Sequence, residues 1–295
     1  MPLLDKLREQ YGVGPLCSEL HIAPSTYYHC QQQRHHPDKR SARAQRDDWL
    51  KKEIQRVYDE NHKVYGVRKV WRQLLREGIR VARCTVARLM AVMGLAGVLR
   101  GKKVRTTISR KAVVAGDRVN RQFVAERPDQ LWVADFTYVS TWRGFVYVAF
   151  IIDVFAGYIV GWRVSSSMET TFVLDALEQA LWARRPSGTV HHSDKGSQYV
   201  SLAYTQRLKE AGLLASTGST GDSYDNAMAE SINGLYKAEV IHRKSWKNRA
   251  EVELATLTWV DWYNNRRLLE RLGHTPPAEA EKAYYASIGN DDLAA

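Results

Sequence analysis

Cysteine is scarce in this sequence: only three cysteines occur among 295 residues, and none has the spacing of a paired set. This scarcity excludes the disulfide framework on which small secreted domains depend. The sequence also lacks an N-terminal signal pattern, an internal repeat of fixed period and a low-complexity tract. Its most apolar stretch, residues 145–162, is interrupted by Asp153 and Gly157, and therefore predicts buried strands rather than a membrane helix. We expect a cytoplasmic protein without a membrane span.

Positive charge is distributed unevenly along the chain. The whole sequence carries a net charge of +11, but residues 1–121 hold 26 Lys and Arg against 11 Asp and Glu, a net +15. The remainder holds 17 basic and 21 acidic residues, a net −4. Because a solvated surface usually interleaves the two signs, the excess in the first part predicts binding to nucleic acid.

A first helical module is predicted in residues 12–30, as two short helices around a corner at residues 22–24. The apolar face of the first helix consists of Val13, Leu16, Cys17 and Leu20. Ser25 is a suitable N-cap for the second helix. The pair fits a helix-turn-helix, although a plain helical hairpin fits equally well. A polar, basic connection is expected to follow at residues 34–48.

A second helical module has a clearer pattern. Its first helix places apolar residues on one face, at Val67, Val70, Trp71, Leu74 and Leu75. Gly78 can end that helix, and a second periodic run buries Val86, Leu89, Met90 and Met93. Arg80, Arg83 and Arg88 would then be available outward. This pattern favours a helix-turn-helix that touches phosphates and bases, with a protein-binding bundle as the alternative.

The next segment, residues 100–121, is a basic linker with few large apolar residues and a single acid, Asp117. Its eight basic residues are Arg100, Lys102, Lys103, Arg105, Arg110, Lys111, Arg118 and Arg121. We expect this linker to lie along DNA phosphates.

From about residue 125 the pattern changes to strands that later alternate with helices. Strands are predicted at residues 131–140, 145–153, 157–165, 189–192 and 213–216. Helices are predicted at about residues 169–184, 201–211, 224–242 and 249–267. An antiparallel meander followed by alternating strands and helices predicts an α/β fold, with a mixed five-stranded sheet and helices on both faces.

Three acidic residues lie where chemistry could use them. Asp135 lies inside the first strand, where a carboxylate facing the core would be costly without a partner. Asp194 directly follows the fourth strand, and Glu230 lies on the helix predicted at residues 224–242. Asp153, by contrast, ends a strand at a turn and is expected to be structural.

The helix that carries Glu230 has an apolar stripe at Ala229, Ile232, Tyr236 and Val240. Asn226, Glu230, Asn233 and Lys237 project elsewhere, with Glu230 and Lys237 two turns apart on the same side. A solvated helix face would show a similar pattern, so this spacing alone is weak evidence.

Three kinds of chemistry compete for these residues. A Ser/His/Asp triad could use Ser193 with His191 or His192, but the sequence contains no G-x-S-x-G turn. A zinc site could use His29, Cys30, His35 and His36, but these lack paired C-x-x-C spacing. Three carboxylates that hold two hard divalent cations, Mg²⁺ or Mn²⁺, are favoured, because like charges in one pocket require cations nearby.

The motifs that contain these acids resemble those of a known family. LWVADFTYV around Asp135, HHSDKGSQY around Asp194 and DSYDNAMAESINGLYKAEVI around Glu230 are similar to the acidic triad of insertion-sequence transposases of the IS-three family, orfB type, which are related to retroviral integrases. Between the second and third acids lie 35 residues, the spacing that names the D,D-35-E group. The resemblance runs from about residue 49 to the C-terminal WYNNRRLLERLGHTPPAEAE, which is most of the chain.

The resemblance implies a ribonuclease-H-like catalytic core in which Lys237 contacts DNA near the active site. It also implies a homo-oligomer on double-stranded DNA, and an upstream orfA-type protein that ribosomal frameshifting can fuse to this one. One position departs from the family pattern: Leu269 stands where a histidine is often found, although Tyr263, Asn264 and Arg267 keep the pattern.

The sequence therefore predicts a transposase that cleaves and joins DNA strands at the ends of an insertion sequence. A nuclease of the same fold that cuts without joining, and a non-catalytic DNA-binding regulator, are the alternatives. The expected location is the bacterial cytoplasm, in association with the nucleoid. The predicted domains are residues 1–48, 49–99, 100–124, 125–245 and 246–295: a helix-turn-helix with its linker, a helical DNA-binding domain, the basic linker, the catalytic core and a helical extension.

Overall fold

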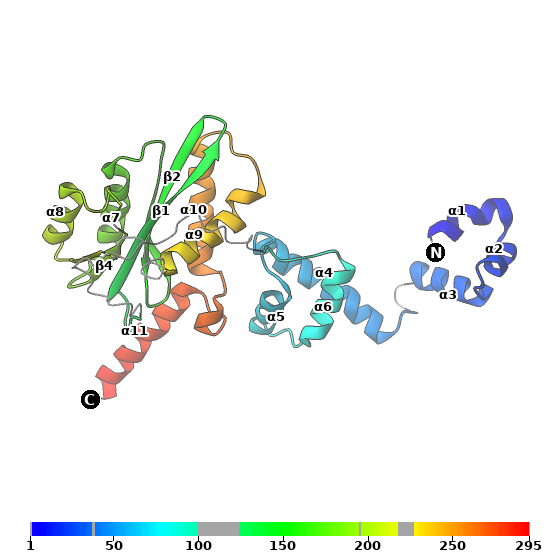
Figure 1. Ribbon diagram of the computed structural model, residues 1–295. Helices are drawn as coiled ribbons and strands as arrows, with labels where there is room; N and C mark the ends of the chain where they lie inside the picture. The colour runs from blue at the N-terminus through cyan, green and yellow to red at the C-terminus, as the bar shows by residue number, and fades with distance from the viewer. Residues whose placement is uncertain (1, 37–38, 100–123, 195, 218–226, 295) are drawn as a thin grey trace, which may run out of the picture. The chain divides into compact units, whose positions relative to one another are not determined.

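The computed structural model describes residues 2–36, 39–99, 124–194, 196–217 and 227–294 (Figure 1). The chain divides into two compact units. One contains residues 1–60 and 70–96, and the other contains residues 61–69 and 97–295. The basic residues predicted to contact DNA between Arg100 and Lys111 lie outside the described residues, so their role remains a prediction.

The first unit begins with three helices, α1 (Pro2–Tyr11), α2 (Val13–Glu19) and α3 (Pro24–His35). Leu4, Cys17 and Tyr27 form their small core, and Val13, Leu16 and Ile22 pack against it. Two details of the sequence prediction are wrong. Leu20 is 46% exposed. The N-cap of α3 is Ala23 rather than Ser25, because Pro24 occupies the first helical position, where its fixed φ is already helical.

Three further helices follow along the chain: α4 (Ala42–Glu60), α5 (Val67–Arg76) and α6 (Arg83–Val92). All belong to the first unit except residues 67–69 of α5, which belong to the second. The sequence predicted α5 and α6. Gly78 follows the end of α5 and has a φ of +81°, which a helix cannot continue through. The prediction for residues 34–48 was wrong, because α4 begins within them. Its first two turns are almost entirely polar and hide the periodicity, and its buried stripe of Leu50, Ile54 and Val57 starts only later.

The second unit is built on a mixed sheet of five strands, in the spatial order β3-β2-β1-β4-β5. The strands are β1 (Leu131–Thr141), β2 (Gly144–Asp153), β3 (Tyr158–Ser165), β4 (Val190–Ser193) and β5 (Leu214–Thr217). The first three form the predicted antiparallel meander, and β4 and β5 add in parallel beside β1. The predicted α/β fold with a ribonuclease-H-like sheet is therefore confirmed.

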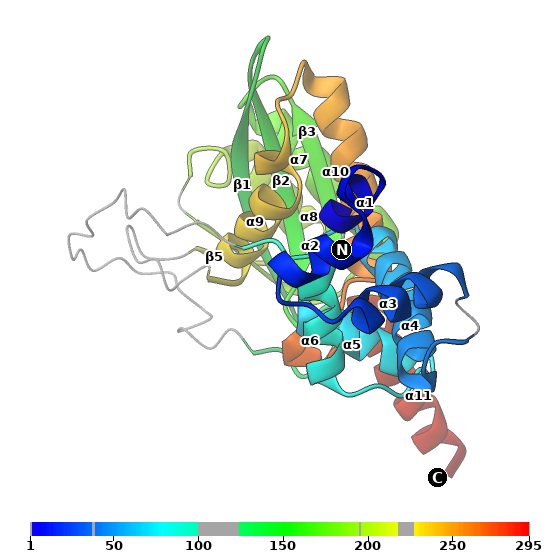
Figure 2. The ribbon, with the colours of Figure 1, turned by 90° about the vertical axis from the view of Figure 1, so that its right-hand side faces the viewer.

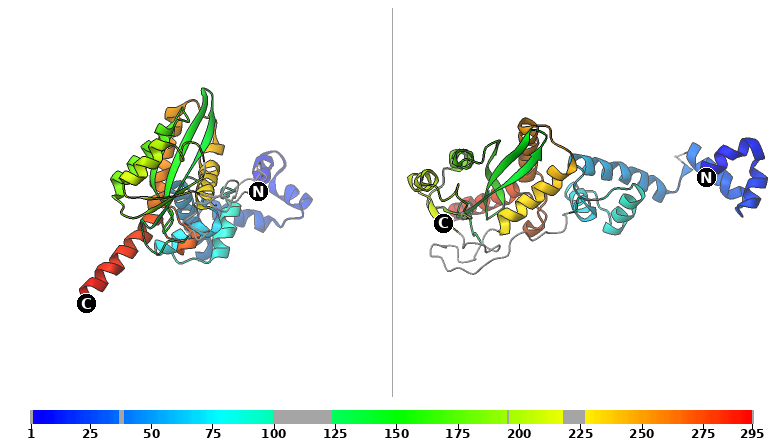
Figure 3. Two further views of the ribbon diagram at one scale, coloured as in Figure 1. Left: turned by 60° about the vertical axis from the view of Figure 1, so that its left-hand side comes forward. Right: turned by 45° about the horizontal axis from the view of Figure 1, so that its top comes forward.

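Helices cover both faces of this sheet (Figures 1 and 3). On one face α7 (Thr170–Arg184) and α8 (Leu202–Glu210) pack on a core that includes Trp132, Ala149 and Ile151. The other face is covered by α9 (Ala227–Glu239) and α10 (Arg249–Asn265), where the ring of Phe150 meets those of Tyr236 and Trp259. Because successive strand residues point to opposite faces, Phe150 faces away from its neighbours Ala149 and Ile151.

Gly161 on β3 allows α7 to approach the sheet closely. A Cβ atom at this position would lie 2.2 Å from the carbonyl oxygen of Ala176. The C-terminal part of the chain continues from α10 through the short 3-10 helix Glu270–Leu272 to α11 (Pro277–Ala294). In the part of the chain that the structure describes, no helix has the length and apolar character needed to cross a membrane.

Asp153 is structural, as its position at a strand end suggested. Its carboxylate accepts hydrogen bonds from the backbone N–H groups of Asp129, at 2.6 Å, and Phe155, at 2.9 Å. It therefore closes the turn between β2 and β3 from inside the core.

A buried ion pair fixes the end of α9. The guanidinium of Arg267 donates to both carboxylate oxygens of Glu239, and the indole N–H of Trp259 donates to Glu239 Oε2 at 3.0 Å. Both charged side chains are at most 5% exposed. Because Glu239 is the last residue of α9, this pair anchors the helix that carries Glu230.

Glu239→Ala should lower the free energy of unfolding by about 3 kcal/mol, because Arg267 would be left as an uncompensated buried charge. Chemical denaturation of the full chain measures this loss. The control is Glu178→Ala, which breaks the exposed pair of Glu178 with Arg207 and should cost less than about 1 kcal/mol. Equal effects of the two substitutions would contradict the anchoring role of Glu239.

Candidate active site

Asp135 and Asp194 are brought together by the parallel pairing of β1 and β4. The register pairs Ala134 with Ser193, the last residue of β4. The next residue along each chain is an acid, Asp135 on β1 and Asp194 in the loop that follows β4. Neighbouring strands lie about 4.8 Å apart, so the two carboxylates leave the sheet close to one another.

Asp135 is the buried member of this pair. Its Oδ1 accepts from the backbone N–H of Phe136 at 2.8 Å, and its Oδ2 accepts from Asn233 Nδ2 at 2.8 Å. Burial, together with the charges of Asp194 and Glu230, raises the pKa of Asp135 from 3.8 to about 7. The two hydrogen bonds oppose this shift without cancelling it. The charged form of Asp135 is therefore costly unless positive charge arrives.

Glu230 approaches the same place from α9, which runs along β1 (Figure 2). The side chain of Glu230 is exposed in the first turn of the helix, and its negative charge contributes to the raised pKa of Asp135. One turn further along, Asn233 is buried and bonds to Asp135 directly. The sequence pattern placed Asn233 among the residues that project away from the apolar stripe of this helix. Its spacing of three residues from Glu230 was the signal that could have identified it.

The loop after β4 holds Asp194 through its own backbone. Asp194 Oδ1 accepts from the N–H of Gly196 at 3.1 Å. A Cβ atom on Gly196 would lie 3.0 Å from that same oxygen, so a larger residue would push against the carboxylate. The two histidines before Asp194 are buried in the core. His191 forms a hydrogen bond with the hydroxyl of Tyr204, and His192 forms one with the hydroxyl of Ser216.

The donor chemistry of these acids fits a hard divalent cation. Carboxylate oxygens are the ligands that Mg²⁺ and Mn²⁺ prefer, and a cation would offset the cost of the buried charge of Asp135. Among the described residues, no three His, Cys, Asp or Glu side chains approach closely enough to form a complete ligand set. The structure thus brings the three acids into one electrostatic neighbourhood without closing a metal site around them.

Tyr199 lies beneath this neighbourhood with an unsatisfied hydroxyl. Its side chain is buried against Phe136 and Tyr204, and its hydroxyl has no hydrogen-bond partner among the residues described. Burial raises the pKa of Tyr199 well above its ordinary value, and the charges of Asp135 and Asp194 raise it further.

Tyr199→Phe should raise the free energy of unfolding by about 1 kcal/mol, because an unsatisfied buried hydroxyl is removed and no hydrogen bond is lost. The matched control is Tyr204→Phe, which removes a buried hydroxyl that bonds to His191 at 3.1 Å and should therefore destabilise. Thermal or chemical unfolding of both variants gives the two signs. A loss of stability in Tyr199→Phe as large as that in Tyr204→Phe would show that the Tyr199 hydroxyl has a partner.

Lys237 reaches around the edge of β1. It lies one turn beyond Asn233 on α9, and its Nζ lies over the ring of Tyr138 at 5.0 Å from the centroid. Burial lowers the pKa of Lys237, and the charge of Asp135 opposes that shift. The ammonium is therefore held between an exposed aromatic ring and the field of the acidic site.

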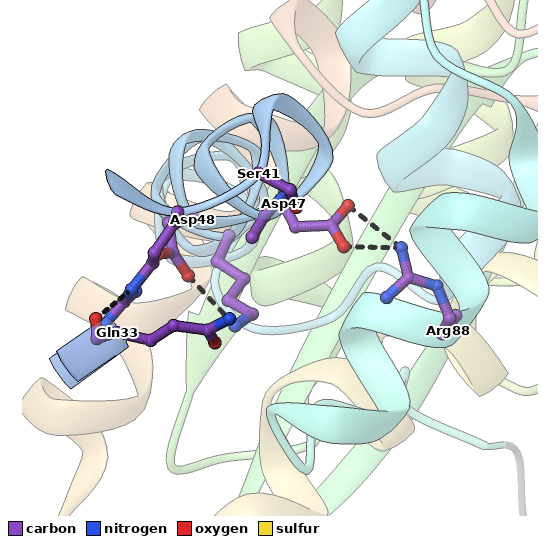
Figure 4. A network of polar contacts seen from close by, with 8 residues as sticks. Gln33, Ser41, Asp47, Asp48 and Arg88 are labelled. Atoms are coloured by element: carbon purple, nitrogen blue, oxygen red, sulfur yellow. Dashed lines mark hydrogen bonds and ion pairs between the residues drawn. The ribbon is translucent and has the colours of Figure 1, made fainter. Parts of the chain in front are cut away.

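The predicted DNA contacts of the helical module differ in their surroundings. Arg83 is exposed at the start of α6. Arg88 is also exposed, but its guanidinium bonds both carboxylate oxygens of Asp47 at 2.9 Å (Figure 4). A phosphate at Arg88 would have to compete with Asp47.

Family models and relatives agree with this architecture. A model of the integrase core domain matches residues 125–223, a second integrase core model matches residues 211–277, and a model of an HTH-like domain matches residues 45–103. The transposase for insertion sequence element IS629 of Shigella sonnei is 99% identical over 295 residues, which is 100% of each chain. The putative transposase for insertion sequence element IS986/IS6110 of Mycobacterium tuberculosis is 54% identical over 273 residues, covering 90% of this chain and 96% of that one.

Among solved structures, the HTLV-2 integrase catalytic core domain in complex with magnesium shares 13% identity at a TM-score of 0.42, covering 53% of this chain and 98% of that chain. The family models and the sequence relatives match this chain far more closely than this solved structure does. Together with the mixed five-stranded sheet, the sequence comparisons define a polynucleotidyl transferase with an integrase core. The chain belongs to the family of transposases of insertion sequence elements.

Proposed function

We propose that the transposase reaction takes place at Asp135, Asp194 and Glu230, which would together hold two divalent cations, Mg²⁺ or Mn²⁺. The observation that carries this proposal is the register of β1 and β4, which sets Asp135 beside Asp194 within the field of Glu230. The reaction is cleavage of a phosphodiester at the end of an insertion sequence by water, followed by attack of the freed 3′-OH on a target strand.

The bound cations would supply Lewis-acid activation of the attacking oxygen and charge neutralisation at the phosphate. The chain supplies the arrangement of the ligands. The N–H of Gly196 orients Asp194, and Asn233 with the N–H of Phe136 orients Asp135. Lys237 would bind a phosphate next to the scissile one, because an ammonium offers only donors and cannot coordinate a cation.

DNA binding is proposed to depend on the basic part of the chain. The exposed Arg83 on α6 would contact the element end. Arg88 on the same helix would also contact it, after giving up its hydrogen bonds to Asp47. The linker residues Arg100, Lys102, Lys103, Arg105, Arg110 and Lys111 would add phosphate contacts. The same proposal includes a homo-oligomer that holds two ends together, action on nucleoid DNA in the cytoplasm, and fusion to an upstream orfA-type protein.

A nuclease of the same fold is the competing function, and joining separates the two. Full-length protein is incubated with Mg²⁺, a supercoiled target plasmid and labelled element ends that already carry a free 3′-OH. Transfer of the label to the plasmid is the expected result. Efficient nicking of uncut ends without any transferred label would assign the chain to the nucleases, and specific binding without nicking would assign it to the regulators.

Lys237→Ala should weaken binding of the element end and slow cleavage about tenfold, while Mn²⁺ affinity stays near the parent value. The reason is that Lys237 lies about two turns from Glu230 on α9 and would reach a phosphate without touching the cations. Mn²⁺ titration and end-binding measurements on the same samples check this. The control is Lys209→Ala, an exposed lysine on α8. Loss of Mn²⁺ binding with intact end binding in Lys237→Ala would show that α9 is oriented differently.

A further inference from the structure

Beyond Asp135, β1 has a free edge. Strand β4 pairs only with residues Leu131 to Ala134, so among the described strands nothing pairs with that side of β1 from Asp135 onward. Tyr138 lies three residues beyond Asp135, which is about 10 Å along a strand. Its ring is 59% exposed although large aromatic side chains usually seek burial.

Tyr138 is part of an exposed aromatic pair. The ring of Phe145, which is 56% exposed, meets that of Tyr138 edge-on at 5.6 Å. The two residues lie on the same face of the β1–β2 hairpin, because Tyr138 pairs with Tyr147 and Ser140 pairs with Phe145. Lys237 adds a positive charge over the Tyr138 ring.

An open cavity of about 370 Å³ adjoins Phe145. It lies between the tip of the hairpin and the start of α10. A backbone hydrogen bond from Trp142 N to Trp246 O joins the hairpin tip to the segment that precedes α10. Arg143 and Arg249 line the cavity beside Phe145. Among the described residues, Arg143 forms no ion pair and Arg249 forms only one, a 3.8 Å contact with Glu253.

We propose that this surface, formed by Tyr138, Phe145, Arg143 and Arg249, binds a short unpaired segment of the DNA strand that leads away from the scissile phosphate. The inference rests on the proposed function, because it takes Asp135 as the place of cleavage. Bases stack on the two rings, and the phosphates between them meet Arg143 and Arg249, while Lys237 keeps the phosphate next to the scissile one. Tyr138 and Asp135 point to opposite faces of β1, so the strand would pass over the free edge of β1 to reach the Tyr138 ring. Because stacked bases in one strand are about 3.4 Å apart, the base at Tyr138 would lie at least three steps from the scissile position.

The chemistry favours an unpaired strand over the other possible occupants. In a duplex each base face is already stacked on its neighbours, so exposed rings beside cations are typical of single-strand sites. A second copy of this chain fits less well, because a symmetric contact would place each patch near its own image and oppose arginines with arginines.

The test measures binding of full-length protein to labelled element ends with a chelator present, so that cleavage cannot interfere. Three probes are compared: a blunt duplex, and duplexes with a five-nucleotide 5′ or 3′ unpaired flap. The unsubstituted protein should prefer one of the flapped ends. Phe145→Ala should lower affinity for that flapped end about tenfold and leave the blunt duplex unchanged, because loss of one stacking ring removes about that much. Phe145→Tyr should restore the preference.

Two controls separate stacking from charge and from folding. Trp182→Ala removes an aromatic side chain on α7 that is 82% exposed, and it should leave all three affinities unchanged. Arg143→Gln should reduce the slope of log affinity against log salt for the flapped end by about 0.7, the value for one phosphate of a single strand.

Three results would overturn the inference. The first is equal affinity of the unsubstituted protein for all three probes. The second is an equal loss of flapped and blunt binding in Phe145→Ala. The third is a Phe145→Ala variant that changes only the oligomeric state in sedimentation, which would assign the surface to a second copy. Because binding is read without cleavage, a protein that prefers the flap but never cuts DNA would contradict the proposed function and leave this site intact.

Discussion

Asp194→Asn should slow cleavage of the element end about a thousandfold or more, and should leave DNA binding within about threefold. Asparagine keeps the shape of the side chain and the acceptor for the Gly196 N–H, so the loop after β4 should stay in place. Asparagine lacks the negative charge that would hold the cations. We expect the cations to lower the activation barrier for cleavage by about 4 kcal/mol. The basic part of the chain is untouched, which preserves affinity for DNA.

The measurement is a single-turnover cleavage assay in Mg²⁺ beside a binding titration on the same end. Asp175→Asn serves as the matched control, because it removes one exposed carboxylate from α7, where Asp175 contacts Arg163 at 3.1 Å. The control should cleave at the parent rate. Parent-like cleavage by Asp194→Asn would remove Asp194 from the set of metal ligands.

Asp135→Asn should stabilise the metal-free protein at pH 8 by about 4 kcal/mol while it abolishes cleavage. Burial and the neighbouring acids raise the pKa of Asp135 from 3.8 to about 7. Between about pH 4 and pH 7 the Asp135 carboxyl is therefore protonated in the folded protein and ionised in the unfolded chain. The wild-type protein therefore gains stability from this group below pH 4 and loses it as the pH rises toward 7. An amide has no such cost.

The asparagine at position 135 can also be accommodated. Asn233 Oδ1 has no hydrogen-bond partner among the described residues, and it can accept from the new amide once the Asn233 side chain turns over. Denaturation at pH 4 and pH 8 with a chelator gives the difference between the two proteins. The expected difference is small at pH 4 and large at pH 8, and saturating Mn²⁺ should stabilise only the wild type. A variant less stable than the wild type at pH 8 would contradict the burial of an uncompensated charge.

The sheet could be predicted because each strand has a recognisable local pattern in the sequence. The segments that form β1, β2 and β3 are rich in β-branched and aromatic residues and are separated by short turns, and their observed bounds lie within a residue or so of the prediction. Asp135 and Asp194 could be singled out as candidates because Asp135 interrupts an apolar strand and Asp194 directly follows another. Such interruptions are visible without any knowledge of packing.

Two of the three missed features depend on contacts between distant segments, and the third is a helix start without a local signal. The bond from Asn233 to Asp135 joins residues 98 positions apart, and periodicity on α9 alone places Asn233 with the solvated side. The start of α4 was missed because Arg43, Gln45 and Arg46 carry no apolar stripe of their own. The ion pair of Glu239 with Arg267 was missed because two exposed charges and two buried, paired charges look the same in a sequence.

We propose above all that this chain cuts DNA at the ends of an insertion sequence by means of divalent cations held at Asp135, Asp194 and Glu230. The most direct test is incubation of the full-length protein with duplex DNA labelled at the boundary of the element, once in Mg²⁺ and once in a chelator. We expect a 3′-OH at the boundary in Mg²⁺ and intact strands, still bound by the protein, in the chelator. Cleavage at the boundary that proceeds equally without divalent cations would contradict the claim.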